Sequence, residues 1–112
     1  MNPSVDFDNR WNERQDICLH ITLLDHSGEI LQTSSKNISI GGIFIEPVPR
    51  QLDIGQKLEV AFSLHSASSS QRHRLPARVV RNHHDGAALA FSDYDRNTLN
   101  ALRILLYDGL TR

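Results

Sequence analysis

The chain has 112 residues, of which 39% are hydrophobic, and its formal net charge is −1. This length suits one domain that buries its own core without disulfides or a metal. The charge excludes the strong basic excess that general binding of nucleic acids or anionic membranes requires, and no apolar run approaches the ~20 residues that cross a bilayer.

The basic residues comprise ten arginines and two lysines. Because arginine is suited to planar, bidentate recognition of phosphates and base edges, this bias indicates a local anion site. Residues 1–8 lack the basic start and the apolar stretch of a signal peptide. Cys18 is the only cysteine, which excludes an internal disulfide and fits a reducing compartment. We therefore expect a soluble, cytoplasmic protein without membrane insertion.

Short segments of alternating or apolar character predict strands along most of the chain. The first alternating segment is followed by the turn Asp25-His26-Ser27-Gly28, in which Gly28 supplies a positive φ. The serine-rich stretch 66–70 reads as a loop, and Asp85-Gly86 as a turn. The predicted strands are 17–24, 30–36, 43–46, 57–64, 74–81 and 87–91.

After these strands the apolar period changes to that of a helix over residues 94–107. Ser92 and Asp95 can form a start resembling a capping box, and Gly109 is a candidate stop. The buried stripe consists of Leu99, Leu102, Leu105 and Leu106. Together the elements predict a mainly β fold, a six-stranded antiparallel barrel with one C-terminal helix packed on it.

Two short motifs stand in order on this scaffold. Arg10-Trp11-Asn12-Glu13-Arg14 is an R-x-x-x-R before the first strand, and Asn37-Ile38-Ser39-Ile40-Gly41-Gly42 is an N-x-S-x-x-G-G after the second. Guanidinium groups can fork onto phosphate oxygens or guanine edges, and can stack on a purine. An amide, a hydroxyl and bare glycine backbone can receive a base. Either motif alone usually marks a solvated pair or a polar turn, so their combination is what indicates a binding site.

With these motifs in this order, the chain resembles the PilZ family, whose receptors for cyclic di-GMP carry R-x-x-x-R followed by [D/N]-x-S-x-x-G. The resemblance covers nearly the whole chain and implies two parts, a flexible N-terminal arm (1–14) and a barrel domain with its helix (15–112). It implies that Arg10 and Arg14 clamp the nucleotide while Asn37, Ser39, Gly41 and Gly42 form a cradle on the barrel. Asn9, Trp11 and Arg81 are further candidates for contact. Asn37 stands where aspartate is commoner, so it accepts from guanine without charge.

Other reactive side chains give no sign of catalysis or metal binding. Cys18 and His20 share one strand face without an orienting acid, so we expect a packed thiol beside a surface histidine. His83 and His84 are neighbours in an extended chain and should point to opposite faces. We therefore expect neither an enzyme, a metal nor a cofactor, and cyclic di-GMP as the only small ligand.

Two other functions stay open at this point. A PilZ-type adaptor in pilus or motility assembly would bind no nucleotide, but such relatives tend to lack both motifs. A small nucleic-acid-binding barrel would interleave exposed aromatics with basic residues, whereas Phe44, Phe62 and Phe91 lie in no basic patch. We therefore expect a signalling receptor that acts by arm closure on an unknown protein partner, as a monomer or weak dimer, and that binds no DNA or RNA.

Overall fold

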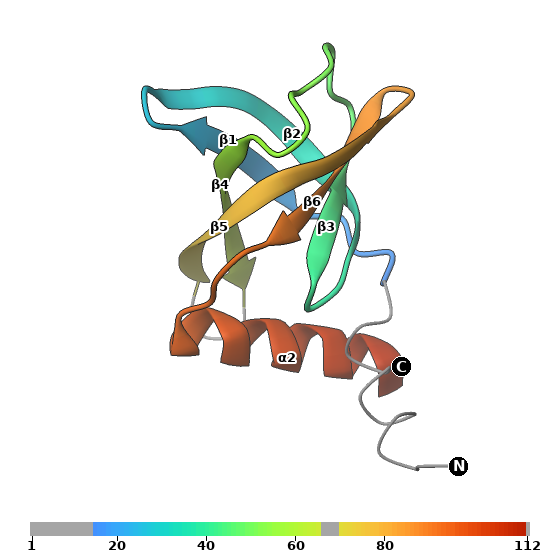
Figure 1. The fold of residues 1–112 in the computed structure, drawn as a ribbon. Coiled ribbons are helices and arrows are strands. Elements are labelled where there is room, and N and C mark those ends of the chain that lie inside the picture. The colour runs from blue at the N-terminus through green and yellow to red at the C-terminus, as the bar shows by residue number, and fades with distance from the viewer. Residues whose placement is uncertain (1–14, 66–69, 112) are drawn as a thin grey trace, which may run out of the picture.

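The structure, a computed structural model, describes residues 15–65 and 70–111, with only the backbone described at 107–111. Its six strands close into an antiparallel barrel in the order β1-β2-β3-β6-β5-β4, and one helix, α2, lies across an end of it (Figure 1). This confirms the predicted fold. The predicted arm (1–14) and residues 66–69 lie outside the described residues. The elements are β1 (His20–Asp25), β2 (Gly28–Ile38), β3 (Gly42–Ile45), β4 (Lys57–His65), β5 (Ser70–His83), β6 (Gly86–Phe91) and α2 (Arg96–Thr111).

The barrel interior is filled by the residues that the period-2 pattern predicted. In β5 the buried positions alternate strictly with exposed ones from His73 to Val79, as expected when one face of a strand meets the core. Within the described part of the chain, no helix has the length and apolar content needed to cross a membrane. The fully buried interior side chains include Ile21, Leu23, Ile38, Ile43, Ile45, Val60, Leu75, Val79 and Ala87.

The helix closes one end of the barrel with two leucines. Leu102 and Leu106 are fully buried and belong to the same cluster as the strand interiors, whereas Ile104 is 64% exposed. The helix therefore completes the core, as the leucine spacing predicted. It continues to Thr111, so the predicted stop at Gly109 is wrong. A glycine within a helix costs only about 1 kcal/mol relative to alanine and does not by itself end it.

The start of α2 also differs from the prediction. Asp95 is the N-cap itself: its carboxylate accepts the Thr98 N–H and the Thr98 hydroxyl, each at 2.8 Å. Ser92 instead donates its N–H to the Pro76 carbonyl at 2.9 Å, so it is no part of a capping box. The hydrogen bonds from the Thr98 backbone and hydroxyl hold the pKa of Asp95 below its ordinary value. Thr98 Oγ also lies 2.9 Å from His73 Nδ1, which ties the helix to β5.

The two tight hairpins have different chemistry. Asp25 accepts hydrogen bonds from the N–H and hydroxyl of Ser27, and Gly28 has a φ of 122°, which confirms the predicted turn. In the β5–β6 hairpin the positive φ of 50° falls on His84, not on glycine. Gly86 pairs with His83 as the first residue of β6, so the turn consists of His84 and Asp85, one residue earlier than the predicted Asp85-Gly86.

Gly86 is a glycine because another side chain occupies the space beside it. A Cβ built there would lie 2.6 Å from Phe44 Cε1 and 2.7 Å from the Ile45 carbonyl oxygen. Phe44 lies between two core residues of β3 and outside the core cluster, so its ring rests on the outer surface over Gly86. This contact fixes β3 against β6 from outside the barrel.

We predict that Gly86→Ala lowers the free energy of unfolding by about 1–3 kcal/mol, because the ring or the strand must shift to admit a methyl group. Urea unfolding measures the change. Gly41→Ala is the matched control, because a Cβ at Gly41 would meet nothing closer than Ser39 Oγ at 3.9 Å. Equal stability of the two variants would contradict this packing.

Candidate functional site

A β-bulge sets the direction in which the second motif faces. Thr33 and Ser35 point into the barrel, so simple alternation would place Asn37 inside as well. The β2–β3 register shifts between Ser35 and Asn37, and Ile38 becomes the next fully buried residue. Asn37 is thereby turned to the outer face, where it is half-buried and pairs with Phe44. Bulges of this kind commonly re-aim side chains beside binding sites.

Ser39 holds the loop that follows β2. Its hydroxyl oxygen accepts the N–H groups of Gly41 and Gly42, each at 3.2 Å, and its own N–H donates to the Gly42 carbonyl at 2.8 Å. The residue is only 4% exposed. The hydroxyl is therefore engaged with the backbone of its own loop, which it shapes.

The two glycines of the motif lie in different surroundings. A Cβ on Gly42 would lie 2.3 Å from the Leu89 carbonyl oxygen, so a side chain there is excluded by β6. Gly41 is exposed, its φ is not in the left-handed region, and the space beside it is open. Its carbonyl accepts the Phe91 N–H at 3.0 Å, which anchors the loop to the end of β6. Neither packing nor backbone conformation explains the glycine at position 41.

The first described residue pairs directly with the second motif. Gln15 donates its N–H to the Ile38 carbonyl at 2.9 Å and accepts the Ile38 N–H at 3.0 Å. Ile38 stands between Asn37 and Ser39 in the sequence, and Arg14 immediately precedes Gln15. The chain that leaves the arm is thus bonded to the centre of the N-x-S-x-x-G segment. This pairing could not be read from the sequence pattern.

A row of paired residues crosses the outer face from Asn37 to Arg81. Asn37 pairs with Phe44, Phe44 with Ala88, and Ala88 with Arg81. Directly paired residues project from the same face, so Asn37 and Arg81 share one side of the barrel across three strand spacings, about 14 Å along the sheet. Here too a register shift, between Val79 and Arg81, turns outward a residue that alternation would place inside.

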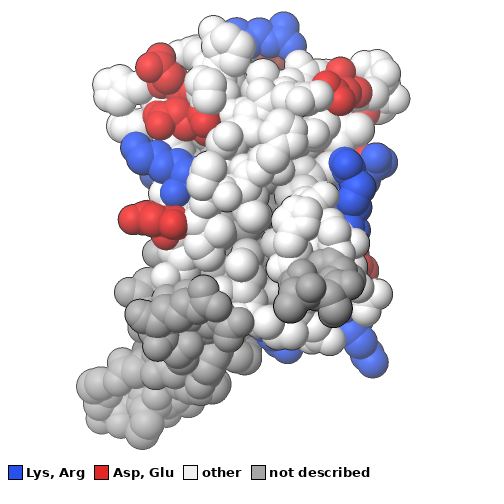
Figure 2. Space-filling view, turned by 180° about the vertical axis from the view of Figure 1, so that it is seen from behind, with Lys and Arg blue, Asp and Glu red and all other residues white. Residues whose placement is uncertain are grey.

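Charged side chains of both signs occur on the surface of the barrel. Lys36 and Glu46 form an exposed ion pair at 3.7 Å, which contributes little to stability. On the face shown in Figure 2, basic and acidic side chains both occur, around a broad uncharged area. That face therefore carries no continuous basic stripe of the kind that nucleic-acid binding requires.

The described chain places some of the predicted residues and not others. Asn37, Gly41 and Arg81 lie on the outer face, while Ser39 and Gly42 are buried in the loop. Asn9, Arg10, Trp11 and Arg14 lie outside the described residues. Cys18 is exposed, so the predicted packing of its thiol is wrong: it shares the outward direction of His20, which is exposed as predicted.

Comparisons with known proteins agree with this architecture. The family model described as "PilZ domain" matches residues 8–108. The structure of the Bacillus subtilis inhibitor of motility superposes with a TM-score of 0.74 at 22% identity, over 88% of this chain and 49% of that one, so this chain spans about half its length. No curated protein matches the sequence.

Two further solved structures share the fold. The PilZ domain of CeSA from a cellulose-synthesizing bacterium superposes with a TM-score of 0.69 at 17% identity, over 89% of this chain and 99% of that one. An uncharacterized Legionella protein gives a TM-score of 0.55 at 18% identity, over 88% and 95% of the two chains. At these identities the likeness concerns the fold.

We predict that Ser39→Ala lowers the free energy of unfolding by about 1–3 kcal/mol, because the buried Gly42 N–H loses its acceptor. Amide hydrogen exchange at Gly41 and Gly42 should accelerate at the same time. Ser34→Ala is the matched control, since the Ser34 hydroxyl makes no hydrogen bond within the described residues. If both variants unfold at the same urea concentration, Ser39 does not hold the loop.

Proposed function

Because the chain belongs to the PilZ domain family, we propose that it is a receptor that binds cyclic di-GMP between residues 1–14 and the loop after β2, and signals to a protein partner. The family is generally one of cyclic di-GMP receptors that interact with proteins, and its members are regulatory domains rather than enzymes. Most of the fold serves to position one edge of this interface.

The pairing of Gln15 with Ile38 is the observation that carries the proposal. It fixes the chain next to Arg14 at the middle of the segment that holds Asn37 and Ser39. Consecutive Cα atoms are about 3.8 Å apart, so the Arg14 backbone starts within one residue of this anchor. The first motif ends one residue before this anchor in sequence, which supports a site shared by two motifs that are more than twenty positions apart.

The residues of the second motif then divide into two roles. Ser39 and Gly42 position the loop, because one is engaged with its backbone and the other is packed against β6. Asn37 and Gly41 present an amide and a bare backbone to the ligand. The open space beside Gly41 supports this role, since a ligand base can approach closest where there is no side chain.

The first motif supplies charge that the loop lacks. Cyclic di-GMP has two phosphates and two guanines, and a guanidinium can bond either group in a bidentate manner. Arg10 and Arg14 take these contacts as the arm closes, with Asn9 and Trp11 beside them. Arg81, which lies in the same row as Asn37 on the outer face, supplies a third cation.

Ligand binding changes the surface of the receptor, and a partner protein recognises the changed surface. The likeness to an inhibitor of motility supports motility as one such output. Cyclic di-GMP is made inside bacterial cells, so the proposal places the receptor in the cytoplasm. The proposed binding site uses the arm and the barrel of a single chain, which agrees with a monomer or weak dimer.

We predict that cyclic di-GMP binds the full chain in calorimetry and that Arg10→Ala and Arg14→Ala each weaken binding by about 1.5–3 kcal/mol, the range of a charge-assisted hydrogen bond. Arg72→Ala is the matched control, because Arg72 is exposed on β5 and pairs with Ser63 of β4, on a part of β5 that does not pair with β6. The unfolding midpoint should not change in any variant.

Two outcomes would contradict this function. Absence of binding by the wild-type chain at millimolar nucleotide would favour the adaptor that binds no nucleotide. Normal binding by both arginine variants would remove the clamp from the mechanism even if the nucleotide binds.

Trp11 provides a separate test of arm closure, because it is the only tryptophan and stands between the two arginines. Closure brings the indole against protein or guanine, so its fluorescence should change saturably with cyclic di-GMP and little with GMP or GTP. Constant emission, in a titration for which calorimetry records binding, would mean that the arm does not move on binding.

A further inference from the structure

The ladder that closes the barrel between β1 and β4 is short. It consists of the pairs Thr22–Ala61, Leu23–Val60 and Leu24–Glu59, whereas β4 pairs with β5 over its whole length. Beyond Thr22 and Ala61 the two strands separate. A groove with a volume of about 480 Å³ runs along this ladder and past its end, lined by Cys18, Leu19, His20, Thr22, Leu24, Glu29, Gln32, Ala61, Phe62, Ser63, His65, Arg72 and Arg74.

Both walls of this groove present main-chain groups. Leu19 exchanges hydrogen bonds with Ser35 of β2, through its N–H to Ser35 Oγ at 2.7 Å and its carbonyl from the Ser35 N–H at 2.9 Å. Main-chain groups alternate in direction along an antiparallel strand, so those of His20 face the groove. By the same alternation from Ala61, the main chain of Ser63 faces it from β4. Neither residue has a ladder partner across the groove among the described residues.

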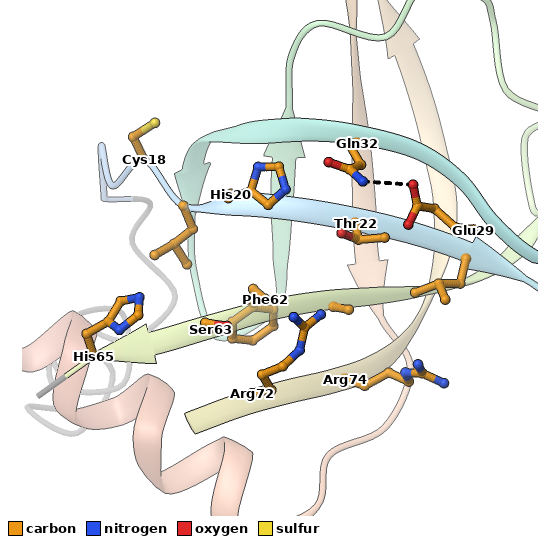
Figure 3. A pocket seen from close by; sticks show the side chains of 13 residues that line it. Cys18, His20, Thr22, Glu29, Gln32, Phe62, Ser63, His65, Arg72 and Arg74 are labelled. Carbon is orange, nitrogen blue, oxygen red and sulfur yellow. Dashed lines mark hydrogen bonds between the residues drawn. The ribbon is translucent and has the colours of Figure 1, made fainter. Parts of the chain in front are cut away.

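One arginine and two histidines lie at the open end of the groove. Arg72 of β5 lies opposite Ser63 of β4. It is exposed and forms no ion pair with a described residue. Figure 3 shows His20 on one side of the gap and Ser63 and Arg72 on the other, with His65 at the open end.

The acidic side chains gather at the closed end instead. Glu59 pairs with Arg74 at 3.4 Å, and Glu29 accepts a hydrogen bond from Gln32 Nε2 at 2.9 Å. The open end thus combines an unpaired guanidinium with two imidazoles, and lacks an acid among the described residues that line it. Negative charge is favoured at that end.

We propose that this groove binds an extended acidic segment of a partner protein, which adds as a strand in the gap between β1 and β4. Strand addition takes its affinity from main-chain hydrogen bonds, and its specificity from the alternate side chains. The main chains of His20 and Ser63 would supply the hydrogen bonds, and Arg72 would contact a carboxylate of the partner segment. Two facing strand edges suit a chain better than a compact phosphate, for which one unpaired arginine is a weak site.

This site shares no residue with the proposed nucleotide site, so the two proposals can fail separately. The probe is a capped peptide of alternating valine and glutamate, titrated into the full chain and followed by NMR amide shifts. We expect saturable shifts at His20 and Ser63. The same peptide with lysine in place of glutamate should cause none.

Variants of the chain and of the probe test each contact. Arg72→Glu should weaken binding of the glutamate peptide by about tenfold or more, because a charge-assisted contact is lost. The affinity for cyclic di-GMP should not change. Arg78→Glu, an equal charge change on the same strand outside the groove, should bind the peptide as wild type does. A backbone N-methylated glutamate peptide should bind far more weakly, because it cannot donate to the strand edges.

Four results would overturn the proposal: no shift at millimolar peptide, equal binding by Arg72→Glu, equal binding of the N-methylated peptide, or displacement of the peptide by inorganic phosphate at the same concentration. The last would identify a general anion site. A dimer in ultracentrifugation that protects the His20 and Ser63 amides would identify a second copy of the chain as the occupant. Loss of cyclic di-GMP binding with peptide binding intact would reject only the nucleotide proposal.

Discussion

A closed barrel allows each strand residue only one of two directions, and the interior accepts a polar side chain only where it finds a hydrogen-bond partner. Thr33 and Ser35 meet this condition, because their hydroxyls donate to the carbonyls of Pro47 and Ile17. Asn37 and Arg81 follow the same alternation and would be buried without a bulge. The two register shifts exchange their direction, and so place both polar groups on the outer face. The candidate site depends on these two irregularities in an otherwise regular barrel.

The regular part of the fold could be predicted from the sequence, because the strict alternation in β5 and the leucine spacing of α2 each indicate which side chains are buried. Contacts between distant elements could not be predicted. From sequence, Gly86 is predicted to be a turn residue, and its contact with Phe44 appears only in the structure. Asp95 is likewise predicted to be one member of a capping box, whereas its carboxylate accepts a hydrogen bond from the Thr98 N–H. Gln15 has no distinguishing neighbour in sequence, and its pairing with Ile38 follows only from the path of the chain around the barrel.

For the candidate site, the motifs identified the segment but not the task of each residue. In sequence, Ser39 and Gly41 both fit a ligand cradle. In the structure the Ser39 hydroxyl bonds the backbone of its own loop, whereas Gly41 faces open space. One sequence signal could have exposed the bulges. A polar residue such as Arg81, two positions after the buried Val79 on an alternating strand, is incompatible with regular pairing. Such a break in pattern predicts a change of direction.

The short β1–β4 ladder also has a consequence for how the barrel forms. The β1–β2, β2–β3, β4–β5 and β5–β6 ladders each join neighbours in sequence, whereas β1–β4 joins residues 22–24 to residues 59–61 and β3–β6 joins residues 42–45 to residues 87–90. The entropy lost on closing the long intervening loop opposes such a distant pairing until enough strand contacts have formed to offset it. With three pairs in one seam and four in the other to offset that entropy, we expect both seams to close after the hairpins have formed. We therefore expect the barrel to fold as two three-stranded units, β1-β2-β3 and β4-β5-β6, which these two seams join. The proposed partner strand would bind beside the β1–β4 seam, where it would hold both edges together.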